Sequence, residues 1–472
     1  MKKITQLLLF SLSTFMIGAI GNAQTSIQGD PERGEYLSIL GDCQACHTYK
    51  AGDGAPFAGG YPISSPLGDI YSSNITPSKK FGIGNYSLEE FTKVLRQGIR
   101  ADGAHLYPAM PYTAYTKLTD EDIADLYAYF MQRVKPVDQP LVHQTDLPFP
   151  FNMRSAMIVW NGLFLKDQRY VENPNKSAEW NRGAYIVEAL AHCSTCHTPR
   201  NFMMGEETSQ YLAGGQLGAW FAPNITSSQV SGIGSWTLAE VVQYLQKGYV
   251  DGKAQAAGPM AEAVEDSFQY THLDDLKAIA TYLLEVPAIE DTKQQQPRDS
   301  YGKPYDVDIE LRGLSPAYAN NTLTDGASLY SAYCASCHQS DGSGTPEQFY
   351  PSLFNNTATG DYNPSNAIAA VLLGVDRQVG QTEFYMPSFG ENSPTQALSD
   401  AEIAKILQFV YQKYGNSQVT ITADMVKEVR LGGPVPLLIT LQPYMIPAMV
   451  VGVLLLLWLI RLIFKRRKDS NK

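Results

Sequence analysis

Cys43-Gln44-Ala45-Cys46-His47 is the first of three Cys-x-x-Cys-His stretches in this chain; Cys193-Ser194-Thr195-Cys196-His197 and Cys334-Ala335-Ser336-Cys337-His338 are the others. Every one of the six cysteines belongs to such a stretch. Two thiols three positions apart share one face of a helical turn, where each can add to a vinyl group of a porphyrin. The following histidine then projects toward the iron. The stretches predict three covalently bound haem c groups.

Zinc sites and disulfides are the alternatives for this cysteine pattern. Six cysteines in an exported protein would ordinarily suggest three disulfides. Zinc also binds cysteine and histidine, but each of the three clusters lacks a fourth ligand. The immediate Cys-x-x-Cys-His spacing therefore favours haem attachment.

An internal repeat supplies candidates for the second iron ligand. Cys43, Gly98 and Met110 recur 150 positions later as Cys193, Gly248 and Met260. The third segment keeps one spacing: 12 residues separate Gly374 from Met386, as they separate Gly98 from Met110. A methionine at helical spacing ordinarily packs in a core. Its recurrence at one offset in all three segments predicts the distal thioether ligand, although Met260 precedes alanine where Met110 and Met386 precede proline.

The predicted site therefore has twelve residues. Haem attachment is assigned to Cys43, Cys46, Cys193, Cys196, Cys334 and Cys337. Iron ligation is assigned to His47, Met110, His197, Met260, His338 and Met386. The histidines at 105, 143, 192 and 272 are expected to have other roles, and the carbonyl of Pro199 is expected to accept the Nδ1–H of His197.

The local pattern around each motif predicts a mainly α-helical shell. Capping boxes open helices at Ser87, Thr237 and Ser399, and final helices are expected over 120–131, 273–284 and 400–414. Each segment also has a glycine followed by a tyrosine before its haem motif: Gly34 with Tyr36, Gly183 with Tyr185, and Gly326 with Tyr330. The glycines should allow close helix approach, and the tyrosines should pack near the porphyrin edge.

Asn74-Ile75-Thr76 and its repeat Asn224-Ile225-Thr226 match the N-glycosylation pattern. Their symmetric placement before a Gly-Ile-Gly stretch favours instead a structural loop or a loop at the haem propionates.

Both ends of the chain predict contact with a membrane. Residues 1–23 have the charged, apolar and small-residue parts of a signal peptide. Residues 445–464 form an apolar stretch long enough for one transmembrane anchor, and the basic residues of the tail 465–472 should stay in the cytoplasm. Between these ends we expect domain 1 over 24–139, domain 2 over 140–288, a linker over 289–317 and domain 3 over 318–425.

Charge and missing motifs exclude several functions. The 472-residue chain has a net charge of −11, and residues 24–460 alone carry −18. So acidic a body repels phosphate backbones, which argues against a nucleic-acid partner. The sequence has neither a nicotinamide-binding fingerprint nor a P-loop. Substrate oxidation is therefore expected on another polypeptide.

These modules and the anchor resemble the tri-haem cytochrome c subunits of membrane-bound, quinone-linked alcohol, gluconate or aldehyde dehydrogenases. The resemblance implies three tandem class I-type cytochrome c domains plus one transmembrane helix. It also implies a subunit of the bacterial inner membrane, with its haems on the periplasmic side, that passes electrons from a large periplasmic dehydrogenase subunit to ubiquinone or another respiratory acceptor.

Three questions remain open from the sequence. The chain could be a free-standing cytochrome that feeds a terminal oxidase, or a haem enzyme if one iron lacks its methionine. The apolar stretch from Val435 to Leu441 could be a plain connector or could reach the membrane interface near the quinone pool.

Overall fold

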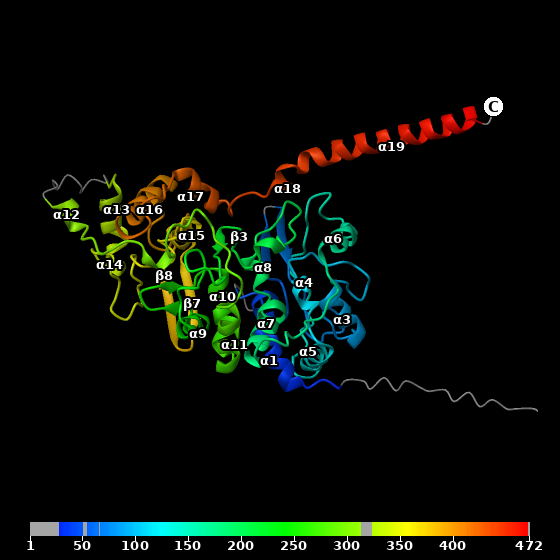
Figure 1. Cartoon of the computed structure of the whole chain (residues 1–472), viewed down its shortest axis with the longest axis horizontal. Helices are drawn as coiled ribbons and strands as arrows, with labels where there is room; N and C mark the ends of the chain where they lie inside the picture. Colours follow the sequence, from blue (N-terminus) through cyan, green and yellow to red (C-terminus); the bar gives the residue numbers. More distant parts are fainter. Residues whose placement is uncertain (1–27, 51–53, 66, 313–322, 471–472) are drawn as a thin grey trace, which may run out of the picture.

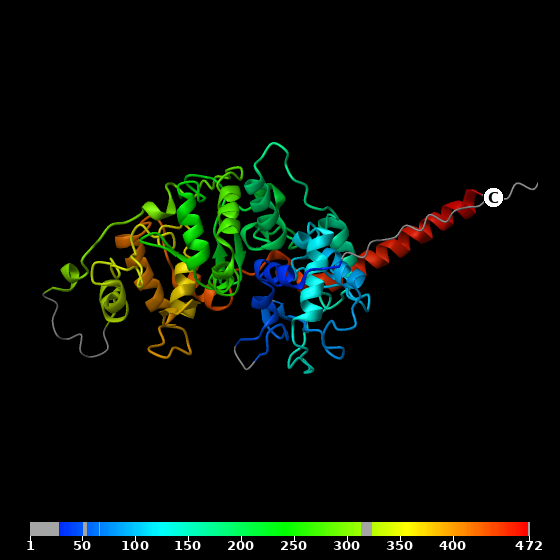
Figure 2. The ribbon, with the colours of Figure 1, turned by 90° about the horizontal axis from the view of Figure 1, so that it is seen from below.

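The computed structural model describes residues 28–50, 54–65, 67–312 and 323–470. The expected signal peptide lies outside these ranges. The described part is mainly helical, and its strands form two-stranded antiparallel hairpins. Three helical modules follow one another, with the second (green) between the first (blue and cyan) and the third (yellow and orange) in Figures 1 and 2.

Module 1 extends from α1 to α5. Its helices are α1 (Pro31–Leu40), α2 (Cys43–His47), α3 (Leu88–Gln97), α4 (Tyr112–Tyr115) and α5 (Asp120–Gln132), and its hairpin pairs β1 (Pro62–Ser65) with β2 (Gly68–Tyr71). The first and last helices, α1 and α5, pack against each other. Helix α6 (Ala156–Phe164) then leads toward module 2.

Module 2 extends from α7 to α11 and repeats this plan. Helix α7 (Ala178–Tyr185) continues into the π-helical turn η1 (Ile186–Leu190), and α7 packs on α11 (Leu273–Leu283) as α1 packs on α5. Between them lie α8 (Ser194–His197), η2 (Thr208–Gln210), β3 (Gly215–Leu217), β4 (Trp220–Ala222), α9 (Leu238–Lys247), β5 (Tyr249–Val250), β6 (Ala254–Gln255), α10 (Pro259–Asp266) and η3 (Phe268–Tyr270).

Module 3 extends from α13 to α17. Its elements are α13 (Gly326–Tyr333), α14 (Ala335–His338), α15 (Ser365–Leu373), β7 (Val375–Val379), β8 (Thr382–Met386), α16 (Asp400–Tyr414) and α17 (Ala423–Arg430). The preceding segment, with η4 (Arg298–Ser300) and α12 (Asp308–Leu311), is not a free tether, because Arg298, Tyr301 and Val307 are buried.

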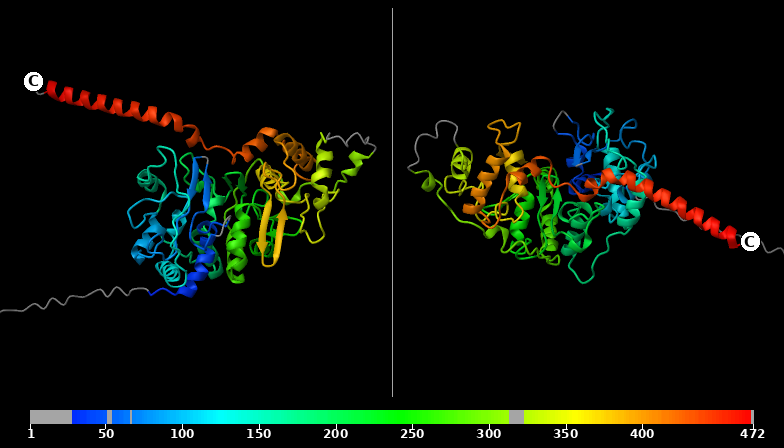
Figure 3. Two further views of the ribbon diagram at one scale, coloured as in Figure 1. Left: turned by 180° about the vertical axis from the view of Figure 1, so that it is seen from behind. Right: turned by 90° about the horizontal axis from the view of Figure 1, so that it is seen from above.

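A long apolar helix ends the described chain. After the short α18 (Leu437–Thr440), helix α19 (Gln442–Ser470) projects away from the modules, as both views in Figure 3 show. Its segment Gln442–Ile463 has a mean hydropathy of 2.5 and is not buried against the rest of the protein. By length and composition this segment could cross a membrane once.

Local signals account for the helix boundaries. All three predicted capping boxes are confirmed at Ser87, Thr237 and Ser399, where the hydroxyl accepts from the N3 amide and the N3 glutamate accepts in return. The helices that begin at the first two boxes end at Gly98 and Gly248, both in the left-handed region.

Glycine also permits the close helix pairs, as predicted. A Cβ added to Gly34 would overlap the carbonyl oxygen of Asp125 in α5. The same holds for Gly183 against Ala278 in α11, and for Gly326 against Lys405 in α16. The shared Gly therefore marks the same crossing of first and last helix in each module.

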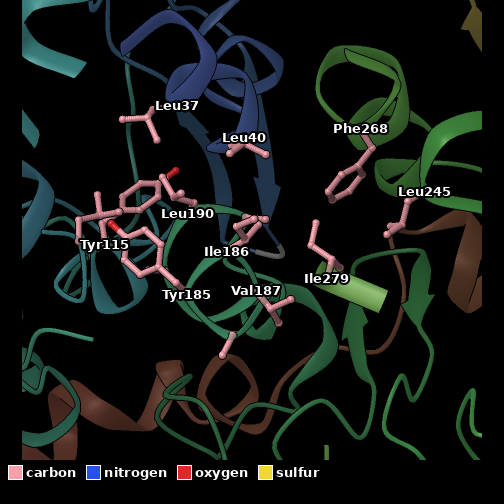
Figure 4. Packing of buried hydrophobic residues seen from close by; sticks show 14 of the residues in the cluster. Leu37, Leu40, Tyr115, Tyr185, Ile186, Val187, Leu190, Leu245, Phe268 and Ile279 are labelled. Atoms are coloured by element: carbon pink, nitrogen blue, oxygen red, sulfur yellow. The ribbon is translucent and has the colours of Figure 1, made fainter. Parts of the chain in front are cut away.

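Modules 1 and 2 share one apolar core, whereas module 3 has its own. In Figure 4, Leu37 and Leu40 of α1 face Ile186 and Leu190 of η1 across the junction of the two modules.

Polar contacts join the same two modules in a nearly symmetric pattern. The Tyr36 hydroxyl of module 1 donates to Asp275 of module 2 at 2.7 Å, and the Tyr185 hydroxyl of module 2 donates to Asp122 of module 1. Within module 2, Arg182 donates to both oxygens of Asp275 at 2.8 Å and so holds the carboxylate that accepts from Tyr36. Because the two tyrosine–aspartate bonds cross between packed helices of the two modules, they fix how the modules are oriented.

Candidate haem sites

Each Cys-x-x-Cys-His stretch folds as one short helical turn. These turns are α2, α8 and α14, or begin one residue before them, and each follows directly after the first helix of its module. All six cysteines are free thiols, so none is consumed by a disulfide. The predicted attachment residues therefore have the local geometry and the chemical state that thioether formation needs.

A backbone carbonyl orients each motif histidine. The Nδ1 atoms of His47, His197 and His338 lie 2.7, 2.7 and 2.9 Å from the carbonyl oxygens of Ser73, Pro223 and Pro351. A carbonyl only accepts, so Nδ1 carries the proton and Nε2 keeps a free lone pair. The prediction that Pro199 accepts from His197 is wrong, because Pro223 is the acceptor. A carbonyl that accepts from the motif histidine is nevertheless present in all three modules.

Burial prepares the same histidines to act as ligands. It lowers the pKa of His197 to about 4 and also lowers the pKa of His47 and His338. A neutral imidazole is the form that binds a metal.

One continuous cavity of about 2420 Å³ connects the three motifs. Its lining is largely apolar, as a porphyrin face requires. The six predicted iron ligands all border it: His47, Met110, His197, Met260, His338 and Met386. Five of the six cysteines border it as well, and Cys337 does not. The structure thus brings together residues that are up to 343 positions apart in the chain, Cys43 and Met386.

The three methionines reach this cavity from different local structures. Met110 lies in the loop before α4, Met260 is the second residue of α10, and Met386 is the last residue of β8. The glycine twelve positions earlier has a positive φ in each module, at 62°, 75° and 78°. The constant spacing therefore begins at a positive-φ glycine in each module, left-handed helical at Gly98 and Gly248 but not at Gly374, and the chain then takes three different paths.

The tyrosines that precede the motifs differ in their surroundings. Tyr330 borders the cavity, in agreement with the prediction. Tyr36 and Tyr185 do not, and the prediction is wrong for them: their hydroxyls form the contacts between modules 1 and 2 described above. In modules 1 and 2, the tyrosine of this pattern therefore lies at the junction between the two modules.

Arg298 is a site residue that the sequence did not suggest. It is buried, borders the cavity, donates to the Asn224 carbonyl at 3.1 Å and lies 3.5 Å from Asp361. Its Nε has no hydrogen-bond partner among the described residues. A haem carboxylate would satisfy such a donor, so this edge of the cavity fits the polar side of a haem.

The Asn-Ile-Thr stretches form buried structural turns. The Asn74 Oδ1 accepts from the backbone and hydroxyl of Thr76 at 2.9 and 2.7 Å, and Asn74 Nδ2 donates to Val137 at 3.0 Å. The Asn224 turn repeats these bonds, with Ile289 in place of Val137. Both asparagines are buried, which confirms the structural role over glycosylation.

The other histidines make aromatic contacts. The ring of His272 stacks on Tyr36 at 4.0 Å, His192 meets the edge of Tyr115 at 5.5 Å, and His143 lies 5.4 Å from Tyr71. The backbone of His105 bridges to Ile99.

Comparison with known proteins agrees with this geometry. Residues 323–412 match the family model of cytochrome c, and residues 30–130 match that of the cbb3-type cytochrome c oxidase subunit III. The chain is 52% identical over 406 residues to the fructose dehydrogenase cytochrome subunit of Gluconobacter japonicus, covering 85% of this chain and 82% of that one.

Two further relatives have other dehydrogenase partners in their names. The gluconate 2-dehydrogenase cytochrome c subunit of Pantoea cypripedii is 36% identical over 443 residues, which cover 91% of this chain and 95% of the relative. The cytochrome c subunit of the quinone alcohol dehydrogenase of Gluconobacter oxydans (strain 621H) is 37% identical over 426 residues, covering 87% and 84%. The chain therefore belongs to the family of electron-transferring cytochrome c subunits of quinone-linked alcohol and sugar dehydrogenase complexes.

Proposed function

We propose that this subunit holds three haem c groups, one in each module, and relays electrons from a large periplasmic dehydrogenase subunit to ubiquinone. The observation that carries the proposal is the cavity in which three Cys-x-x-Cys-His motifs and three equally spaced methionines meet. The domain limits that go with it are 24–139, 140–288 and 318–425, with a linker over 289–317.

The residues that would hold the haems follow from their chemistry. Cys43 with Cys46, Cys193 with Cys196, and Cys334 with Cys337 would form the thioether bonds. His47, His197 and His338 would bind the iron through Nε2, and Met110, Met260 and Met386 would bind it through the thioether sulfur. When bound in this way, haem supplies reversible one-electron redox chemistry at raised potential.

Binding of each iron by two side chains would favour a relay over catalysis at the iron. With one histidine and one methionine as ligands, the iron would have no coordination site left for oxygen or peroxide. The common cavity supports transfer between modules, because no layer of protein separates the three predicted sites completely.

The membrane arrangement rests on α19 and its flanks. The apolar segment Gln442–Ile463 would cross the bacterial inner membrane once. The basic residues after it would lie in the cytoplasm and the haem modules in the periplasm, after removal of a signal peptide over 1–23.

The quinone end of the relay is proposed at the start of this anchor. Val435, Leu437 and Leu438 border the same cavity as the haem motifs, and so do Met445 and Met449 of α19. Leu437 is 59% exposed, and the neighbouring Val435 and Leu441 are exposed as well, so an apolar surface faces outward just before the anchor. An apolar quinone ring at the membrane surface could therefore approach the relay here.

The dehydrogenase partner is proposed to oxidise a sugar, a sugar acid or an alcohol. Fructose is the first substrate to test, because identity to the fructose dehydrogenase cytochrome subunit is 52%, against 36% and 37% for the gluconate and alcohol relatives. The acidic body, at −18 over residues 24–460, would suit a basic docking face on that partner.

The proposal is tested by extraction from native membranes in mild detergent. We expect a larger cofactor-bearing chain to co-elute, three haems per cytochrome chain, and haem reduction by fructose, gluconate or an alcohol. Reoxidation by a soluble ubiquinone analogue should follow, and should slow when Leu437 and Leu438 are both replaced by serine. A cytochrome that elutes alone, and is reduced by quinol but by none of these substrates, would instead be a free-standing donor to a terminal oxidase.

A further inference from the structure

The β7–β8 hairpin belongs to module 3 but is anchored on module 2. Strand β7 contacts α10, the helix that carries Met260, and Figure 1 shows the hairpin beside α10. At the hairpin tip, the Gly380 amide donates to Gln269 Oε1 at 3.0 Å, and Gln269 Nε2 donates to the Gln378 carbonyl at 3.1 Å.

Arg377, in the middle of β7, extends into module 2. Its side chain is completely buried, at 0% exposure. It donates to the Ala256 carbonyl and, at 2.9 Å, to Gln255 Oε1. Its guanidinium carbon lies 4.4 Å from the centre of the Phe384 ring. A residue of module 3 thus forms its hydrogen bonds with module 2.

Among the described residues, no carboxylate forms an ion pair with this buried cation. Its Nε has no hydrogen-bond partner in the described part of the chain. Glu265 is near enough to act on it electrostatically, but the Glu265 carboxylate pairs with Lys50 at 3.5 Å. Burial lowers the pKa of Arg377 to about 10, which still leaves the group positive at neutral pH.

Module 1 has a different residue at the equivalent place. A Cβ added to Gly98 would lie 2.7 Å from the ring of Tyr112, which belongs to module 1 itself. A Cβ added to the repeat residue Gly248 would lie 2.7 Å from Nε of Arg377. The residue 150 positions after Tyr112 is Glu262, so module 2 has no tyrosine of its own there. The neutral ring of Tyr112 beside Gly98 in module 1 thus corresponds to the cationic side chain of Arg377, from module 3, beside Gly248 in module 2.

The neighbours of Arg377 belong to the predicted haem site of module 2. Gln255, whose Oε1 accepts from Arg377, borders the cavity. Ala256, whose carbonyl Arg377 holds, is four residues before Met260. The guanidinium therefore binds the backbone four residues before the predicted methionine ligand.

We propose that Arg377, which belongs to module 3, raises the reduction potential of the haem in module 2 by its fixed, buried positive charge. The inference rests on the proposed function, because it requires a haem in module 2. Reduction adds one electron to the site, and a cation in a low-dielectric interior stabilises the added negative charge. A haem of raised potential in the central module would attract electrons from its neighbour.

The test is a redox titration of the full-length, detergent-solubilised complex, followed by optical spectroscopy. Arg377→Met removes the charge and keeps a long side chain. It should lower the midpoint potential of one haem by at least 59 mV, which is a tenfold change in its electron-sharing equilibrium, and leave the other two in place. Met260→His should shift the same step of the titration, which assigns that step to the haem of module 2. Arg377→Lys should stay close to wild type.

Arg133→Met is the matched control, since Arg133 is a partly exposed arginine of module 1 that pairs with Glu32. It should move no step. Glu265→Gln removes the carboxylate that acts electrostatically on Arg377, so it should raise the step that Arg377→Met lowers, and it replaces the methionine variant if that variant loses haem.

Three results would overturn the inference: equal potentials in Arg377→Met and wild type, a shift of all three steps together, or the same shift in the lysine variant. Failure of the proposed function would be visible separately, as fewer than three haems per chain in the wild-type protein.

Discussion

Met386 is the residue at which ligation by methionine can be tested most directly, because it ends strand β8 and borders the cavity. Met386→Leu keeps the volume of the side chain and removes the thioether sulfur. We expect one of the three haems to lose its low-spin spectrum and its potential to fall, since methionine ligation raises haem potential. Electron paramagnetic resonance of the oxidised protein checks this.

Met425→Leu is the matched control. Met425 packs against the core of module 3 and does not border the cavity. The substitution should leave all three haems low-spin and cost less than about 1.5 kcal/mol of stability. Equal spectra in the two variants would remove Met386 from the ligand set.

Residue patterns predicted the candidate haem-binding residues, but not the residues that hold them in place. The cysteines, histidines and methionines were predicted because their spacing repeats within short segments. The carbonyl acceptors at Ser73 and Pro223 were not, since each belongs to a loop 26 residues beyond its histidine. Arg298 and Arg377 were not predicted either, because their partners lie in another module.

At the scale of elements, the close crossing of first and last helix should depend on glycine. Gly183→Ala places a methyl group against the Ala278 carbonyl in α11, so α7 and α11 must separate. We expect a loss of about 1–3 kcal/mol in the free energy of unfolding, the usual cost of overpacking. Thermal unfolding monitored by circular dichroism measures it.

Gly162→Ala, in the last turn of α6, is the control for helix propensity. Nothing lies within 4 Å of an added Cβ there. Alanine should stabilise that helix by about 0.5–1 kcal/mol. Similar effects of opposite sign at the two glycines would separate the close approach from the general preference of helices for alanine.

Helix limits were predictable because capping is local. The boxes at Ser87, Thr237 and Ser399 each involve residues within one turn. The π-helical turn Ile186–Leu190 was not predicted, because it forms where module 2 packs on α1, and no local pattern specifies that contact.

At the scale of the whole molecule, the junction of modules 1 and 2 should be sensitive to acid. Burial opposes ionisation of Asp275, but hydrogen bonds from Arg182 and Tyr36 outweigh it and hold its pKa below the usual value. A depressed folded-state pKa means that the stabilisation is present above the unfolded pKa of about 4 and is lost as pH falls through the folded value. Melting temperatures between pH 6 and 3 should therefore decline at the acid end.

Asp275→Asn should flatten the part of this decline that Asp275 causes and lower stability at pH 6 by about 1.5–3 kcal/mol, as for a lost hydrogen bond to a charged group. Asp274→Asn is its control, because Asp274 is exposed and pairs only with the partly exposed Lys277, three residues along the helix. An unchanged pH profile in Asp275→Asn would show that this joint does not govern acid stability.

The last helix separates membrane attachment from the relay itself. Deletion of residues 442–472 removes α19, which is not buried against the modules, so the two apolar cores of the three modules should fold unchanged. We expect a soluble periplasmic cytochrome with three haems that its dehydrogenase still reduces, while quinone reduction falls strongly, because the apolar surface around Leu437 is no longer held at the membrane. Fractionation after an alkaline wash, haem content and the two half-reactions measure this. A truncated protein that stays in the washed membrane, or that reduces membrane quinone at the wild-type rate, would show that α19 is not the anchor.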